Sequence, residues 1–153
     1  MFQRIKITAL VALVFFIASC KKEPSIPPVS TPSTPESNIV FLAVLRGSNE
    51  VPANNSTALG SAILTYNPVK KTFTTTVSFI DLVPTVAHIH RGAAGTNGGV
   101  VFGFPSPIVS PINYTSGVLS AALESDLKAN GFYVNVHSAR FMGGEIRGQL
   151  IRQ

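Results

Sequence analysis

Three histidines are the residues in this sequence whose types and spacing point most directly to chemistry. His88 and His90 lie two positions apart, and His137 ends the segment Tyr133-Val134-Asn135-Val136-His137. Histidines at i and i+2 of a β-strand have Cα atoms roughly 6.5–7 Å apart, so both rings can lean onto one metal ion. A third histidine on an adjacent strand would leave one coordination position open. Imidazole suits copper, zinc, nickel and iron, so the identity of the metal stays open.

A second interpretation of the same residues needs no metal. The histidines would then lie on a strand surface, hydrogen-bonded to Glu145, Asn135 or backbone carbonyls. Glu145 could orient a histidine ring, and Arg147 could steer or bind an anion. Alternatively, these two charges form an exposed ion pair on the last strand, which would contribute at most about 1 kcal/mol. Glu50 is expected in a turn that Pro52 stiffens.

Strand parity is the condition for bringing these side chains together. Successive side chains of a strand point to opposite faces, so His88 and His90 share one face. By the same rule Tyr133, Asn135 and His137 share a face in their strand. Glu145, Arg147 and Gln149 share a face in the last strand. Each of the three strands therefore has a polar face and an apolar face.

The rest of residues 38–153 predicts short strands separated by turns. A continuous apolar run at 39–45 favours a buried strand, and 72–79 alternates as a half-buried strand does. Further strands are expected at 60–66, after Pro84, and at 100–102, 112–119, 132–138 and 145–151. One helix is expected at 121–129, with Ser120 as its N-cap. This pattern predicts an all-β sandwich or barrel with Greek-key connections and one short helix.

Residues 1–19 have the anatomy of a secretory signal, with a short basic opening and an apolar run. The segment Ile17-Ala18-Ser19-Cys20 resembles the lipobox of bacterial lipoproteins, which implies cleavage before Cys20 and lipid on its sulfur. The alternative is a secretory signal with an incidental cysteine. Residues 20–37 are rich in Pro, Ser and Thr and favour an extended tether. We therefore expect a cell-envelope protein that is held on the outer membrane through its lipid and faces the periplasm or the cell surface.

The remaining segment, 38–153, fits one domain. It contains eight Lys and Arg against five Asp and Glu. No basic run with interleaved aromatic residues occurs, which argues against nucleic acid as a partner. The sequence has no Gly-x-Ser-x-Gly elbow and no close carboxylate pair, so it offers no catalytic residues of a hydrolase or glycosidase.

Several separated motifs resemble the CHRD domain, the module named for its copies in chordin. They are Asn49-Glu50-Val51-Pro52, Ala87-His88-Ile89-His90 with the glycines after it, Tyr133 to His137, and Gly144-Glu145-Ile146-Arg147-Gly148. The resemblance spans nearly all of 38–153. It implies an immunoglobulin-like β-sandwich in an extracytoplasmic protein that acts as a binding or structural module.

The layout is also similar, more faintly, to that of copper/zinc superoxide dismutases. That similarity implies that His88, His90 and His137 match three copper ligands and that Arg147 matches the arginine beside the copper. The sequence lacks a fourth histidine and a cysteine pair. Two hypotheses follow: a non-enzymatic module for an extracytoplasmic protein or ligand, or a metal-handling or redox protein that holds copper or zinc on three histidines.

Overall fold

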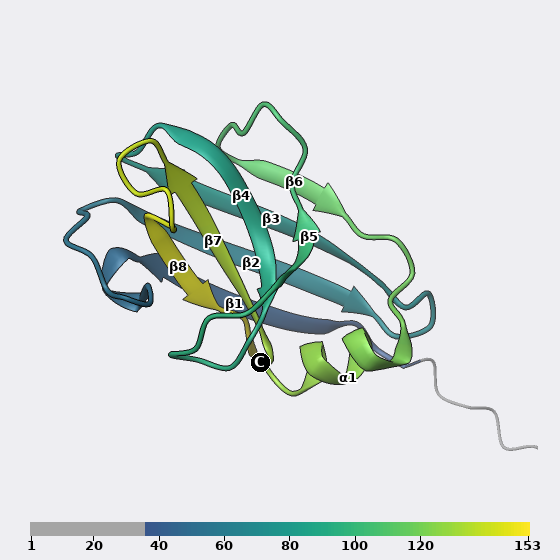
Figure 1. Cartoon of the computed structure of the whole chain (residues 1–153). Coiled ribbons are helices and arrows are strands. Elements are labelled where there is room, and N and C mark those ends of the chain that lie inside the picture. Colours follow the sequence, from purple (N-terminus) through teal and green to yellow (C-terminus); the bar gives the residue numbers. More distant parts are fainter. Residues whose placement is uncertain (1–35) are drawn as a thin grey trace, which may run out of the picture. The chain divides into compact units, whose positions relative to one another are not determined.

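The computed structural model describes residues 36–153, which form a curled antiparallel β-sheet with one short helix (Figure 1). The signal peptide, Cys20 and nearly all of the tether lie outside the described residues. Within residues 36–153, no helix is long and apolar enough to cross a membrane.

The sheet has the strand order β5-β4-β7-β8-β1-β2-β3-β6. The short strand β9 pairs with Phe41 and Leu42 of β1. All of the pairings are antiparallel. The elements are β1 (Ile39–Arg46), the 3-10 helix η1 (Gly47–Asn49), β2 (Leu59–Asn67), β3 (Thr72–Ile80), β4 (Pro84–Arg91), β5 (Val100–Gly103), β6 (Ile112–Thr115), α1 (Ala121–Lys128), β7 (Phe132–Ser138), β8 (Ile146–Gln149) and β9 (Ile151–Arg152).

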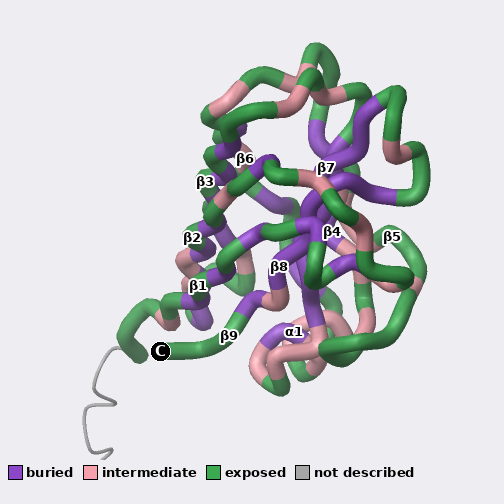
Figure 2. Tube along the Cα trace, turned by 90° about the vertical axis from the view of Figure 1, so that its left-hand side faces the viewer, coloured by how far each residue is buried: buried purple, intermediate pink, exposed green. Residues whose placement is uncertain are grey.

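The two ends of this strand order meet through their aromatic side chains. Phe102 of β5 packs against Phe73 with ring centroids 5.0 Å apart, and Phe104 packs against Tyr114 of β6 at 5.4 Å. The sheet therefore curls over a single apolar core, which Figure 2 shows as buried positions that alternate with exposed ones along β1, β2 and β3. Fully buried core side chains include Phe41, Leu45, Leu64, Tyr66, Phe73, Ile89, Phe132, Val134 and Ile146.

Local sequence signals explain several of these elements. In the β2–β3 hairpin, the side chain of Asn67 accepts a hydrogen bond from the backbone of Lys70, and Lys71 takes a left-handed conformation at φ 54°. Ser120 caps α1, because its side chain accepts a hydrogen bond from the backbone of Leu123. Asn130, at φ 59°, reverses the chain before β7.

Three expectations about strands were wrong in detail. β1 is not buried throughout, because Val40, Leu42 and Val44 are exposed while the alternate residues face the core. The strand expected at 112–119 ends at Thr115. The last strand is broken at Leu150, whose backbone N–H donates to the carbonyl of Phe132 and whose side chain fills the core.

The polar face of β4, β7 and β8 is covered by loops, so every residue of β7 is buried. The loop formed by residues 92–99 contacts the loop formed by residues 50–58, since Asn97 Nδ2 donates to the carbonyl of Val51 at 2.8 Å. Asn54 Nδ2 joins the second loop to the start of β8 by donating to the carbonyl of Glu145 at 3.0 Å. A layer of polar side chains is therefore enclosed between the sheet and these two loops.

Candidate metal centre

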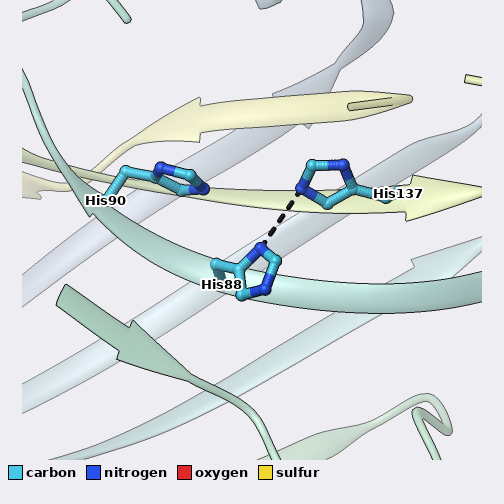
Figure 3. Close-up of side chains that lie close together, drawn as sticks. All are labelled: His88, His90 and His137. Carbon is cyan, nitrogen blue, oxygen red and sulfur yellow. Dashed lines mark hydrogen bonds between the residues drawn. The ribbon is translucent and has the colours of Figure 1, made fainter. Parts of the chain in front are cut away.

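The three histidines of the sequence converge at the rim of this polar layer. His88 and His90 project from β4 and His137 from β7, which is the neighbouring strand (Figure 3). One ring nitrogen from each residue can be chosen so that all three lie within 4.8 Å of one another. Side-chain parity on two paired strands is sufficient to produce this arrangement.

The closest pair of ring nitrogens has the spacing of two ligands on one ion. His88 Nδ1 lies 3.3 Å from His137 Nε2. Two nitrogens that each bind a tetrahedral zinc ion at about 2.0–2.1 Å are themselves separated by about 3.3 Å. The ring of His88 lies 5.1 Å from that of His137 and 5.4 Å from that of His90, measured between centroids.

His90 is held by the glycine-rich loop. Its Nδ1 lies 2.9 Å from the carbonyl oxygen of Gly98, which can only accept, so we assign the ring hydrogen to Nδ1. The loop brings Gly98 this close because that residue has no side chain: a Cβ there would overlap the carbonyl of Arg91. The Gly98 N–H also donates to the hydroxyl of Tyr133 at 3.2 Å. Among the described residues, the buried Nε2 of His90 has no hydrogen-bond partner.

His137 is held in the same way by a different loop. Its Nδ1 lies 2.9 Å from the carbonyl oxygen of Met142, so one of its two neutral tautomers donates from Nδ1 to that carbonyl. Its Nε2 faces His88 Nδ1 and the side-chain oxygen of Asn135, which is 3.1 Å away. With the ring hydrogen on Nδ1, both His90 and His137 donate to a backbone carbonyl and keep the lone pair of Nε2 for a metal ion.

The surroundings favour the neutral form of His88 and of His90. Burial lowers the pKa of His88, and the neighbouring charges of His137 and His90 lower it further. Burial also lowers the pKa of His90, although the hydrogen bond to Gly98 opposes that effect. A neutral imidazole is the form that binds a metal ion.

Arg147 contacts the glycine-rich loop and the ring of Tyr133. Its guanidinium carbon is 3.4 Å from the centroid of the Tyr133 ring, and its Nη2 donates to the carbonyl of Thr96 at 2.6 Å. Its Nη1 donates to the side-chain oxygen of Asn97 at 3.2 Å. Arg147 is 2 % exposed, so it is a buried clamp on the glycine-rich loop rather than the exposed residue of an ion pair.

Glu145 and Glu50 also differ from the sequence expectations. Glu145 Oε1 accepts a hydrogen bond of 2.6 Å from the hydroxyl of Ser56, and within residues 36–153 it pairs with neither Arg147 nor a histidine. Glu50 ends a turn, because its N–H donates to the carbonyl of Gly47, and its side chain is buried in the polar layer. Burial raises the pKa of Glu50 to about 7, although the charge of Arg147 lowers it.

Sequence reasoning missed the contribution of Tyr133 to this centre. Its ring stacks on that of His90, with centroids 4.9 Å apart and planes inclined by 5°. The signal was present, because Tyr133 shares strand parity with Asn135 and His137. The carbonyls of Gly98 and Met142 could not be found in this way, because a backbone acceptor leaves no mark in the residue type.

The fold and this site define a β-rich module with three clustered histidines on a loop-covered face. The family model of the CHRD domain matches residues 41–150, which include all of the histidines. The chain therefore belongs to the CHRD domain family. No curated protein and no solved structure matches it.

Proposed function

We propose that this protein is a metal-binding module that holds a copper or zinc ion on His88, His90 and His137. One observation carries the proposal: the Nδ1 atoms of His90 and His137 are each 2.9 Å from a backbone carbonyl, and a hydrogen placed on each Nδ1 leaves both Nε2 atoms with a lone pair for a metal ion. Metal-binding histidines almost always donate their other N–H to a carbonyl, carboxylate or water.

Burial of His90 Nε2 favours a metal over a purely structural role. A buried polar atom without a hydrogen bond costs about 1–3 kcal/mol, and this nitrogen has no partner among residues 36–153. A metal ion at the centre would recover that free energy. Copper and zinc both accept imidazole nitrogen at this spacing, and the donor set of three histidines alone suits either ion.

We also propose a setting for the module. Residues 1–19 would be a lipoprotein signal peptide, residues 20–37 a tether with lipid on Cys20, and residues 38–153 the CHRD domain in the cell envelope. The strand order is compatible with an immunoglobulin-like Greek-key sandwich. Metabolic labelling with radioactive palmitate tests the anchor: the wild-type chain should become labelled and Cys20→Ser should not. Equal labelling of the two would contradict the anchor.

The layout supports a distant similarity to copper/zinc superoxide dismutases only for the three histidines. Arg147 is linked to the proposed centre through Tyr133, because its guanidinium packs on that ring and the ring stacks on His90. The alternative function is a metal-free module that binds an extracytoplasmic protein or another ligand.

Equilibrium dialysis of the full chain against Zn²⁺ and Cu²⁺ separates these two functions. We expect one ion per chain for the wild type and for Asp81→Asn, which removes an exposed carboxylate outside the group of three histidines. We expect His90→Ala and His137→Ala to bind at least tenfold more weakly. Metal binding that is absent from the wild type, or unchanged in both histidine variants, would overturn the proposed function.

A further inference from the structure

We propose that the side-chain oxygen of Asn135 is the fourth ligand of this centre, and that Glu50 holds the amide in the orientation that presents this oxygen. This inference rests on the proposed function and adds an oxygen donor to the three imidazoles. The site would then be a mixed centre of three nitrogens and one oxygen.

The backbone places Asn135 at the middle of the cluster. It is the direct cross-strand partner of His88 and lies two positions before His137 on the same face of β7. Side chains directly opposite each other on paired strands have Cβ atoms about 4.5–5.5 Å apart. Asn135 Oδ1 lies 3.1 Å from His137 Nε2, close to the 3.3 Å that separates His88 Nδ1 from the same nitrogen.

His137 faces two acceptor oxygens but has only one ring hydrogen in its neutral form. A neutral imidazole carries one ring hydrogen, which can serve either the carbonyl of Met142 or the oxygen of Asn135, but not both. With the hydrogen on Nδ1, the Nε2 of His137 and the oxygen of Asn135 turn lone pairs toward each other. A cation bound by both atoms converts this repulsion into attraction.

Glu50 accounts for the orientation of the amide. Gly144 brings the two groups together, since a Cβ on this glycine would overlap Glu50 Oε1 and lie 2.9 Å from Asn135 Nδ2. The buried Oε1 of Glu50 has no hydrogen-bond partner among the described residues, so it can accept from this amide nitrogen. One oxygen of a carboxyl group accepts whether or not the other oxygen is protonated, so Glu50 favours the orientation that points the NH₂ group toward it and leaves Oδ1 facing His137.

An oxygen ligand also narrows the choice of metal. Thioether and thiolate ligands select monovalent copper, whereas carbonyl oxygens suit harder, divalent ions. Three imidazoles with one amide oxygen therefore favour Zn²⁺ or Cu²⁺ over Cu⁺. Asn135 is 3 % exposed, so this ligand is supplied from inside the protein.

Cobalt(II) spectroscopy of Asn135→Cys tests the assignment directly. A thiolate bound to Co²⁺ produces a strong sulfur-to-metal charge-transfer band in the near ultraviolet, and one that is not bound produces none. All chains carry Cys20→Ser, so that the introduced thiol is the only one present. We expect the band with Asn135→Cys and not with the control Ala139→Cys, whose position is exposed just beyond β7.

Two further measurements keep the test decisive if Asn135→Cys fails to fold. In the wild-type chain, the side-chain ¹⁵N amide resonance of Asn135 should shift when Zn²⁺ binds. Asn135→Asp, which keeps an oxygen donor, should bind Zn²⁺ at least as tightly as the wild type, whereas Asn135→Leu should bind at least tenfold more weakly.

The outcomes distinguish this inference from the function on which it rests. If the wild type binds Co²⁺ and Zn²⁺ through the histidines, but Asn135→Cys gives no band and the Asn135 amide does not shift, the fourth ligand is overturned and the metal site survives. If the wild type binds neither ion, both proposals fail together. Unchanged Zn²⁺ affinity in a folded Asn135→Leu would also overturn the fourth ligand.

Discussion

Arg147 and Tyr133 form a cation–π pair, with the guanidinium carbon 3.4 Å from the ring centroid. The same ring stacks on His90, so contacts run from β8 across β7 to the histidine on β4. Arg147 also donates to the carbonyl of Thr96, two residues before the Gly98 carbonyl that holds His90. Arg147 therefore holds both the loop of residues 92–99 and the Tyr133 ring against which His90 packs.

Arg147→Lys should destabilise the protein by about 2 kcal/mol, because lysine keeps the charge but loses the planar fork and its stacking. Urea unfolding measures the loss, and hydrogen exchange should show faster exchange of amides in residues 96–98. The exposed Arg152→Lys serves as the control and should stay within about 0.5 kcal/mol of the wild type. Equal urea midpoints for both variants would mean that Arg147 does not clamp the loop.

Gly144→Ala should destabilise the protein by more than 1 kcal/mol, while Gly143→Ala should have little effect. Gly144 has φ 131°, and a Cβ there would meet Glu50 and Asn135. A Cβ on Gly143 would meet nothing within 4 Å, and its backbone is not left-handed. Thermal unfolding of the pair measures the difference. Similar melting temperatures for the two variants would argue against the packing of Glu50 and Asn135 beneath Gly144.

Glu50→Gln should stabilise the metal-free protein at high pH and not at low pH. Burial raises the pKa of Glu50 from 4.5 to about 7, so the unfolded chain releases this proton at lower pH than the folded chain does. Stability is therefore lost as pH rises from 4.5 to 7, by up to about 3 kcal/mol. Denaturant unfolding in EDTA at pH 4 and pH 8 should show a gain for Glu50→Gln only at pH 8.

Glu124→Gln serves as a control, because the pKa of Glu124 is shifted in the opposite direction to that of Glu50. The hydrogen bond from Lys128 lowers the pKa of Glu124, so its contribution to stability is present at neutral pH and lost as pH falls. This variant should gain no stability at pH 8. If Glu50→Gln behaves like Glu124→Gln at both pH values, the Glu50 carboxyl is not held in a desolvated site.

Metal should stabilise the folded protein through the same three histidines. Free Zn²⁺ at 100 times its dissociation constant should add about 2.7 kcal/mol to the free energy of unfolding of the wild type. His88→Ala should lose most of this gain, whereas Asp81→Asn should keep it. Calorimetric scans with Zn²⁺ and with EDTA measure the shift, and an equal shift in His88→Ala would place the ion elsewhere.

Strand parity and capping signals carried much of the prediction from sequence. The alternation Tyr133-x-Asn135-x-His137 predicted which side chains share a face, and β7 has the predicted bounds, Phe132–Ser138. Ser120 predicted the start of α1. Both inferences use local backbone geometry, which a single sequence encodes well.

Burial of the polar face could not be predicted in this way. Whether Arg147 is exposed or enclosed depends on where the loops of residues 50–58 and 92–99 fold, and this is set by contacts between distant residues such as Asn97 and Val51. The same limit applies to β1. Its composition suggested a buried strand, but the face of β1 that carries Val40, Leu42 and Val44 is exposed. Apolar composition reports the tendency to be buried, but not which sheet face finds a covering layer.

A crystal structure of the full chain with bound Zn²⁺, with anomalous diffraction collected at the zinc edge, tests the central claim most directly. The account predicts one anomalous peak about 2.0–2.1 Å from Nε2 of His90, Nε2 of His137 and a ring nitrogen of His88. Density between these rings without an anomalous peak, or a single zinc ion bound away from all three histidines, would contradict it.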